Sequence, residues 1–225
     1  MRWVIGILVV LAVAAAAWFL RDPIIGLFSS AVPAAVPEAP AVTEPATTTY
    51  ASSTLGYSFD YPKTYALNEA YQYDFSPSKS IRGVAVAAPA QTGTNLGSDT
   101  RVSVEQLPRA ATCTADIFII ADVKAKPVSD SQNGTEYSYA TTTGAAAGNV
   151  YEEMVYAFPK SKPCTAIRYA IHSTNIGKAD ASVGSPTNSV GATESTVREF
   201  DRSALLEGFH AIRRSFKFFS APETQ

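Results

Sequence analysis

The sequence contains few of the residue types that most often carry chemistry. Its 225 residues include two cysteines, two histidines and two tryptophans, and charged residues make up 17% of the chain, against roughly 25% in a typical globular protein. The formal net charge is −2. His172 and His210 are not part of a cluster with metal-ligand spacing. These features argue against a metal site, a catalytic cysteine–histidine pair and a nucleic-acid-binding surface.

Catalytic motifs are equally scarce. The stretch from Ser76 to Lys79 matches Ser-x-x-Lys, a nucleophile pattern of penicillin-interacting enzymes, but the Ser-Asp-Asn and Lys-Thr-Gly partners are missing. Glu152 and Glu153 are adjacent on a predicted strand, so they face opposite sides and cannot act as a pair. We therefore expect a protein that is not an enzyme, without catalytic residues, cofactor or metal. An envelope hydrolase that uses Ser76 and Lys79 is the least favoured alternative.

A long apolar run stands near the N-terminus. Trp3–Leu20 is 18 residues long without a charge, and as a helix it would span roughly 27 Å, close to the thickness of a bilayer's hydrocarbon core. Arg2 precedes the run, while Arg21 is offset by the aspartate that follows it. The positive-inside rule then predicts a single-pass protein of the cell membrane, with a cytoplasmic N-terminus and an extracytoplasmic C-terminal domain. Residues 1–22 would be a signal anchor; a signal peptide cleaved near Ala12–Ala14 is the alternative.

The next segment, residues 23–49, has the composition of a linker. Its part from 29 to 49 contains four prolines but no aromatic and no basic residue. Such a segment buries too little apolar surface to offset its ordering entropy, and repeated proline favours extended conformations. We expect a tether, followed by a folded domain over residues 50–220 and a short tail over 221–225.

Strand signals dominate the predicted domain. Residues 55–62 alternate, with Tyr57, Phe59 and Tyr61 on one face, and a proline ends the run. Further predicted strands are 81–88, 100–107, 135–143, 149–158 and 165–173. The turns between them favour an antiparallel meander over parallel βαβ units.

Two helices and one long loop complete the expected domain. A short helix is predicted over residues 114–125. A second is predicted near the C-terminus, with a final edge strand over 216–219, because six apolar residues share one helical face: Val197, Phe200, Ala204, Leu205, Phe209 and Ile212. Residues 175–195 divide into three heptads that each contain an aliphatic residue followed by glycine, a pattern that cannot make a coiled-coil seam. A flexible loop is predicted over 175–196.

The aromatic stripe on 55–62 suits a core strand better than a platform for a stacked ligand, because few basic residues flank it. The expected structural core is Tyr57, Phe59, Tyr61, Phe200, Leu205, Phe209, Ile212 and Phe216. Charged residues around the C-terminal helix alternate in sign, so we expect a solvated face rather than an anion site. The basic members of that group are Arg198, Arg202, Arg213, Arg214 and Lys217.

Two motifs resemble those of a known family. "GYSFDYP", which begins at residue 56, resembles the opening strand of Mog1/PsbP-like domains, and "GFHAIRRSFKF", which begins at residue 208, resembles their closing helix and strand. The resemblance covers residues 50–219. It implies an α+β fold, an α/β/α sandwich with a central antiparallel sheet. Members are mostly non-catalytic domains that bind protein partners or have no known role, and many are exported bacterial domains behind a single anchor.

The two cysteines, Cys113 and Cys164, both lie in the predicted exported domain. An even number of cysteines in an oxidising compartment indicates a disulfide. A disulfide that closes the loop between Cys113 and Cys164 would stabilise the fold by about 4 kcal/mol in the chain-entropy model.

We expect a non-catalytic domain, tethered by its membrane helix, that binds a protein partner in the cell envelope in an assembly or adaptor role. The alternative is a small-molecule or lipid carrier. No nucleic-acid partner is expected, and the ectodomain is expected to be monomeric.

Overall fold

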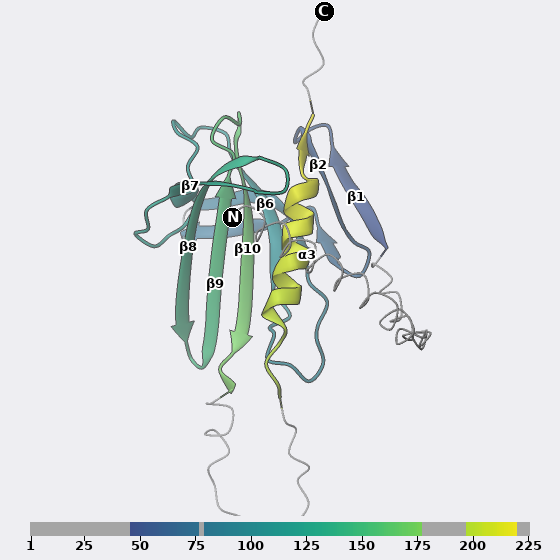
Figure 1. Cartoon of the computed structure of the whole chain (residues 1–225). Coiled ribbons are helices and arrows are strands. Elements are labelled where there is room, and N and C mark those ends of the chain that lie inside the picture. The colour runs from purple at the N-terminus through teal and green to yellow at the C-terminus, as the bar shows by residue number, and fades with distance from the viewer. Residues whose placement is uncertain (1–45, 77–78, 177–196, 220–225) are drawn as a thin grey trace, which may run out of the picture. The chain divides into compact units, whose positions relative to one another are not determined.

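The computed structural model describes residues 46–76, 79–176 and 197–219 (Figure 1). The predicted anchor, nearly all of the predicted linker, the tail and most of the 175–196 loop lie outside these ranges. Within them, no helix combines the length and apolar character needed to cross a membrane.

A large antiparallel sheet forms the centre of the described domain. Its strands, in spatial order, are β3 (Ala66–Asn68), β5 (Lys79–Ala87), β6 (Arg101–Leu107), β10 (Cys164–Thr174), β9 (Asn149–Ala157), β8 (Glu136–Ala146) and β7 (Lys126–Ser129). The strand β4 (Gln72–Ser76) also pairs with β5. The predicted meander is confirmed, since β8, β9 and β10 are consecutive antiparallel neighbours.

A second, smaller sheet has the order β1 (Thr47–Ser52), β2 (Tyr57–Pro62) and β11 (Lys217–Phe218). The aromatic run and the closing strand, far apart in the sequence, are therefore adjacent in space. The strand β1 begins inside the segment predicted as linker, so the linker boundary at residue 49 is wrong by three residues. Threonine is compatible with both extended linkers and strands, and pairing with β2 makes 47–49 part of the sheet.

The C-terminal helix α3 (Arg202–Ser215) begins later than its apolar pattern suggests. Asp201 is its N-cap and accepts a hydrogen bond from the Ala204 amide at 2.9 Å, which fixes the start of the helix. The residues before it do not continue the helix, because the Arg198 amide donates to the Gly93 carbonyl and the Phe200 amide to the side chain of Asn95. Ala204 is exposed, so it does not belong to the buried face.

The helix predicted over 114–125 is wrong: only the 3₁₀-helix η1 (Ala115–Phe118) forms there. Tertiary partners take up its backbone groups, since the Ala115 amide donates to Ser138 and the Phe118 carbonyl accepts from Arg168. Ile119 is extended, a conformation that β-branched residues favour, and residues 120–125 form no helix.

The large sheet is covered on both faces. On one face α3 and β2 lie beside each other (Figure 1) and enclose an aromatic core with the sheet. On the other face η1 and β4 enclose a second core that contains many alanines and both cysteines. The described residues thus form a mostly antiparallel α+β domain with one α-helix, and a 3₁₀-helix with extended chain lies where a second helical layer was expected.

Candidate functional site

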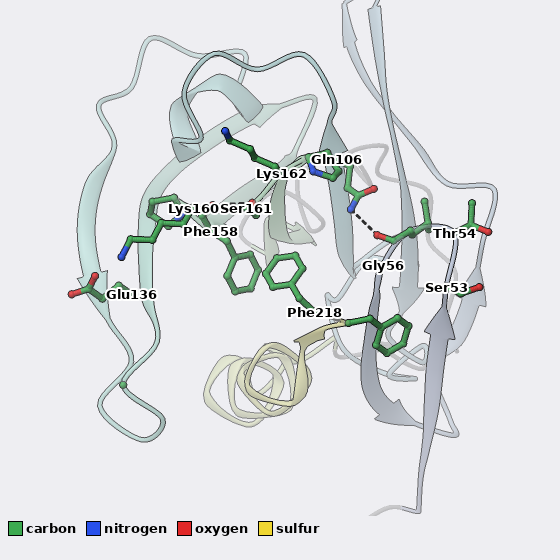
Figure 2. A pocket seen from close by; sticks show the side chains of 15 residues that line it. Ser53, Thr54, Gly56, Gln106, Glu136, Phe158, Lys160, Ser161, Lys162 and Phe218 are labelled. Carbon is green, nitrogen blue, oxygen red and sulfur yellow. Dashed lines mark hydrogen bonds between the residues drawn. The ribbon is translucent and has the colours of Figure 1, made fainter. Parts of the chain in front are cut away.

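An open groove of about 1170 Å³ lies where the two sheets of the described domain meet. Figure 2 shows the residues that line it. They come from the β1–β2 turn (Ser53–Gly56), from β6 (Gln106), from the start of β8 and the turn before it (Glu136, Gly134), from the turn after β9 (158–163) and from β11 and the residue after it (Phe218, Phe219). We call it the β11 groove.

Aromatic rings form the floor of the β11 groove. The Phe158 ring lies 4.8 Å from that of Phe216 and 5.0 Å from that of Phe218. Phe216 is buried and anchors the cluster to the core, whereas Phe218 and Phe219 are 44% and 42% exposed. The groove therefore presents apolar surface to solvent on a rigid base.

The walls of the groove are held by hydrogen bonds. The Gln106 side-chain amide donates to the Leu55 carbonyl at 3.1 Å (Figure 2), and the Phe219 amide donates to the Gly56 carbonyl at 2.9 Å. Gly56 has a φ of +76°, a conformation that favours glycine and allows the tight turn. These contacts fix the β1–β2 turn against β6 and β11.

The turn over residues 158–163 adds basic charge to the rim. Lys160 and Lys162 are exposed there, and Glu136 is the acidic residue that lines the groove. The Ser161 hydroxyl donates to the Phe158 carbonyl and accepts from the Thr165 amide, both at 2.9 Å. The groove thus combines an aromatic floor with a basic rim, which suits an apolar segment that carries negative charge.

The predicted disulfide stands behind this turn. Cys113 and Cys164 are bonded, with an S–S distance of 2.11 Å and a Cα–Cα distance of 5.1 Å. The bond ties the segment before η1 to the first residue of β10, and both cysteines are buried. It holds the 158–163 turn by its C-terminal end.

The structure places six of the eight predicted core residues in the buried aromatic cluster. Tyr61 and Phe200 pack against the cluster and remain partly exposed. The buried members are Tyr57, Phe59, Leu205, Phe209, Ile212 and Phe216.

The side chains of the residues considered for chemistry have other contacts in the structure. Lys79 places its ammonium 4.4 Å from the centre of the Phe75 ring. In the β4–β5 ladder it is the register partner of Ser76, and no hydrogen bond joins their side chains within the described residues. Glu152 and Glu153 face opposite sides as predicted, because the first binds Arg202 and the second Arg168.

The two histidines contact different partners. His172 lies 2.5 Å from Asp99 through Nδ1 and 3.0 Å from Asn149 through Nε2. His210 contacts the Tyr169 hydroxyl at 3.1 Å, and burial followed by the nearby arginines lowers its pKa. In the part of the chain that the structure describes, no group of three potential ligands could hold a metal ion.

A buried ion network, which no sequence pattern predicts, lies on the second face of the large sheet. Arg168 is fully buried and donates two hydrogen bonds of 2.8 Å to Glu105, one of 2.8 Å to Glu153 and one of 2.6 Å to the Phe118 carbonyl. Its guanidinium carbon lies 3.7 Å from the centre of the Tyr73 ring. Burial alone would lower the pKa of Arg168, but the hydrogen bonds and charges of the two glutamates raise it. The one available signal was a charge inside the apolar run 164–171.

The known proteins to which the chain is similar were found by structure and not by sequence. No protein-family model and no curated protein matches the sequence. Among solved structures, the chain is similar to cyanobacterial PsbP (CyanoP) from Synechocystis sp. PCC 6803, with 14% sequence identity and a TM-score of 0.31, over 82% of this chain and 99% of that one.

The chain is also similar to a protein from Bacteroides thetaiotaomicron VPI-5482, with 8% identity and a TM-score of 0.39. The match covers 79% of this chain but 50% of the other, so the chain spans about half the length of the Bacteroides protein. No site residue is carried over from either structure.

Proposed function

We propose that the chain is a non-catalytic, membrane-tethered extracytoplasmic protein that binds a protein partner in the cell envelope. In this proposal residues 1–22 anchor the chain and the proline-rich segment after them holds the domain away from the membrane. The Cys113–Cys164 bond supports an oxidising location outside the cytoplasm. The domain is a variant of the α/β/α sandwich in which η1 and its extended flanks take the place of the second helical layer.

The exposed pair Phe218 and Phe219 carries the proposal. Both are more than two-fifths exposed at the mouth of the β11 groove, next to the ring of Phe158. Exposed aromatic rings above a rigid base are typical of interaction sites, where they supply most of the binding energy. Within the described residues, β11 pairs with β2 alone, so its second edge is free.

The partner we propose is an extended segment of an envelope protein. Its backbone adds to the free edge of β11, in the manner of strand addition to a sheet. Its apolar side chains contact Phe158 and Phe218, and its acidic side chains face Lys160 and Lys162 on the rim. This choice rests on charge complementarity, because the exposed charges of the 158–163 turn are both positive.

Site-specific cross-linking in the source cells tests the proposal. The full-length chain carries the photoreactive residue p-benzoylphenylalanine at position 218 or, as a control, at position 151. Tyr151 is 42% exposed and does not line the β11 groove. We expect position 218 to capture one envelope protein, through a peptide that alternates apolar residues and contains acidic ones, and position 151 not to capture it.

A matched pair of variants completes the test. Phe218→Glu places negative charge in the groove and is expected to weaken recovery of the captured protein by at least roughly tenfold. Tyr151→Glu, which adds the same charge elsewhere, is expected to leave recovery unchanged. Equal capture from both positions, or capture that Phe218→Glu does not reduce, would overturn the proposal. Capture of lipid alone at position 218 would replace it with the carrier function.

A further inference from the structure

A second pocket lies between β7, β8 and the C-terminal end of α3, and it is independent of the function proposed above. It has a volume of about 340 Å³, at the lower end of the range for small-molecule sites. Three tyrosines from β8 and β9 form one side: Tyr137, Tyr139 and Tyr156. Basic side chains from α3 and β7 form the other. We call it the arginine pocket.

Arg213 lies at the base of the arginine pocket, so the predicted solvated face is wrong for this residue. Its side chain is 7% exposed. One terminal nitrogen lies 2.5 Å from Asp130 Oδ2, and the guanidinium carbon lies 4.1 Å from the centre of the Tyr156 ring. Its Nε atom is buried and has no hydrogen-bond partner among the described residues. Buried guanidinium donors without an acceptor are costly, which marks this residue as incompletely satisfied.

Arg214 approaches the same carboxylate. Its Nε lies 3.4 Å from Asp130 Oδ2 and is also buried without a hydrogen bond. One of its terminal nitrogens contacts Glu207 at 3.2 Å, but that glutamate is 70% exposed. The single carboxylate of Asp130 therefore lies between two guanidinium groups, each with donors that it does not use.

Positive charge prevails around the pocket. Lys126 adds a third cation, with its ammonium 5.6 Å from the centre of the Tyr139 ring. Against these three cations stand Asp130 and the exposed Glu207. Burial first, and then the charges of Arg213 and Arg214, lower the pKa of His210, which also lines the pocket. Asp130 has a lowered pKa as well, because its hydrogen bonds from the Gln132 amide and Arg213 outweigh its burial.

We propose that the arginine pocket binds the carboxylate of a small aromatic acid. Guanidinium forks match the geometry of a carboxylate, and Arg213 and Arg214 both line the pocket. The tyrosines supply a wall for a ring. A singly charged acid fits better than a dianion, because Asp130 is already present and repels additional negative charge.

Calorimetric titration of the full-length chain in neutral detergent at low salt tests this site. The probe is benzoate, and benzyl alcohol is the uncharged analogue of similar shape. We expect saturable binding of benzoate, with benzyl alcohol at least roughly tenfold weaker, because one charge-assisted hydrogen bond is worth that ratio or more. Inorganic phosphate is expected to bind more weakly than benzoate.

Charge-removing variants locate the site. Arg214→Gln and Lys126→Gln are each expected to weaken benzoate binding, the first by roughly tenfold. Arg198→Gln removes the same charge from an exposed residue outside the pocket and is expected to change nothing. Circular dichroism checks that each variant is folded. Unchanged affinity in both pocket variants, equal binding of benzyl alcohol, or tighter binding of phosphate would overturn the proposal.

Discussion

Arg168 and Tyr169 are neighbours on β10, and both are fully buried, yet they point to opposite faces of the large sheet and meet different partners. Tyr169 packs against the rings of Phe209 and Tyr156, with centroid distances of 5.3 and 5.2 Å. Arg168 binds two glutamates and a backbone carbonyl. One face is thus held by ring packing, and the other by ion pairing beside a disulfide.

The two faces should tolerate different kinds of substitution. A ring-packed face loses stability roughly in proportion to the volume removed, because neighbouring side chains relax only partly. The stability of an ion-paired face depends on every buried charge keeping its partner. A buried charge that loses its partner costs more free energy than the pair contributes. The two faces should therefore respond differently to the removal of a polar group.

The largest expected effect is on the ion-paired face. Arg168→Met leaves Glu105 buried without its partner and is expected to lower the free energy of unfolding by about 4 kcal/mol. Urea-induced unfolding measures the loss. The double variant Arg168→Met, Glu105→Leu removes both charges and is expected to recover most of the stability. A double variant no more stable than the single one would show that pairing does not hold this face.

The disulfide on the same face gives the next effect. Replacing Cys113 and Cys164 by alanine is expected to lower the free energy of unfolding by about 4 kcal/mol, because the unfolded chain gains freedom. The same urea experiment measures it. Under reducing conditions the native protein and the variant should become equally stable. A difference that persists there would indicate that the alanines damage packing.

On the ring-packed face, removal of a polar atom should have the opposite sign. The Tyr57 hydroxyl is buried without a hydrogen-bond partner among the described residues, and burial raises its pKa. Tyr57→Phe is therefore expected to leave stability unchanged or raise it by up to about 1 kcal/mol. Tyr169→Phe is the control, because that hydroxyl contacts His210 and its loss should cost about 1 kcal/mol. A clear loss with Tyr57→Phe would reveal a hidden partner for its hydroxyl.

The smallest effect depends on pH. The pKa of His210 in the folded chain lies below its ordinary value of 6.5, so the unfolded chain takes up the proton first as the pH falls. The contribution of His210 to the free energy of unfolding is therefore fully present above about pH 6.5. It is lost as the pH falls from there towards the pKa of His210 in the folded chain. His210→Gln removes this contribution. Urea unfolding of both proteins at about pH 7.5 and about pH 5.5 should show a larger decline for the native chain, and equal declines would contradict the prediction.

The ring-packed core could be predicted from the sequence, and the ion network on the other face could not. Alternation in 57–61 and helical spacing at Leu205, Phe209 and Ile212 are local patterns, and each predicts a buried surface. The partners of Arg168 come from β6, from β9 and from η1. Such pairing depends on strand order, which no local pattern encodes.

The same limit applies to the candidate sites. The β11 groove joins residues from both ends of the domain, and only the register of Lys217 and Phe218 on β2 places them together. The sequence does not predict the arginine pocket, because charges that alternate in sign along the chain indicate a solvated surface. Burial of Arg213 against Tyr156 follows from packing between α3 and the large sheet, which is a tertiary contact.

The position of β1 has a mechanical consequence. It is the first described strand and an edge of the small sheet, paired with β2 from Thr47↔Pro62 to Ser52↔Tyr57. A pulling force that reaches Thr47 across the strand direction breaks this ladder one pair at a time, whereas a force along the strand loads all pairs together. Tyr50 is its one buried residue. We therefore expect β1 to detach first under tension, while the large sheet stays folded.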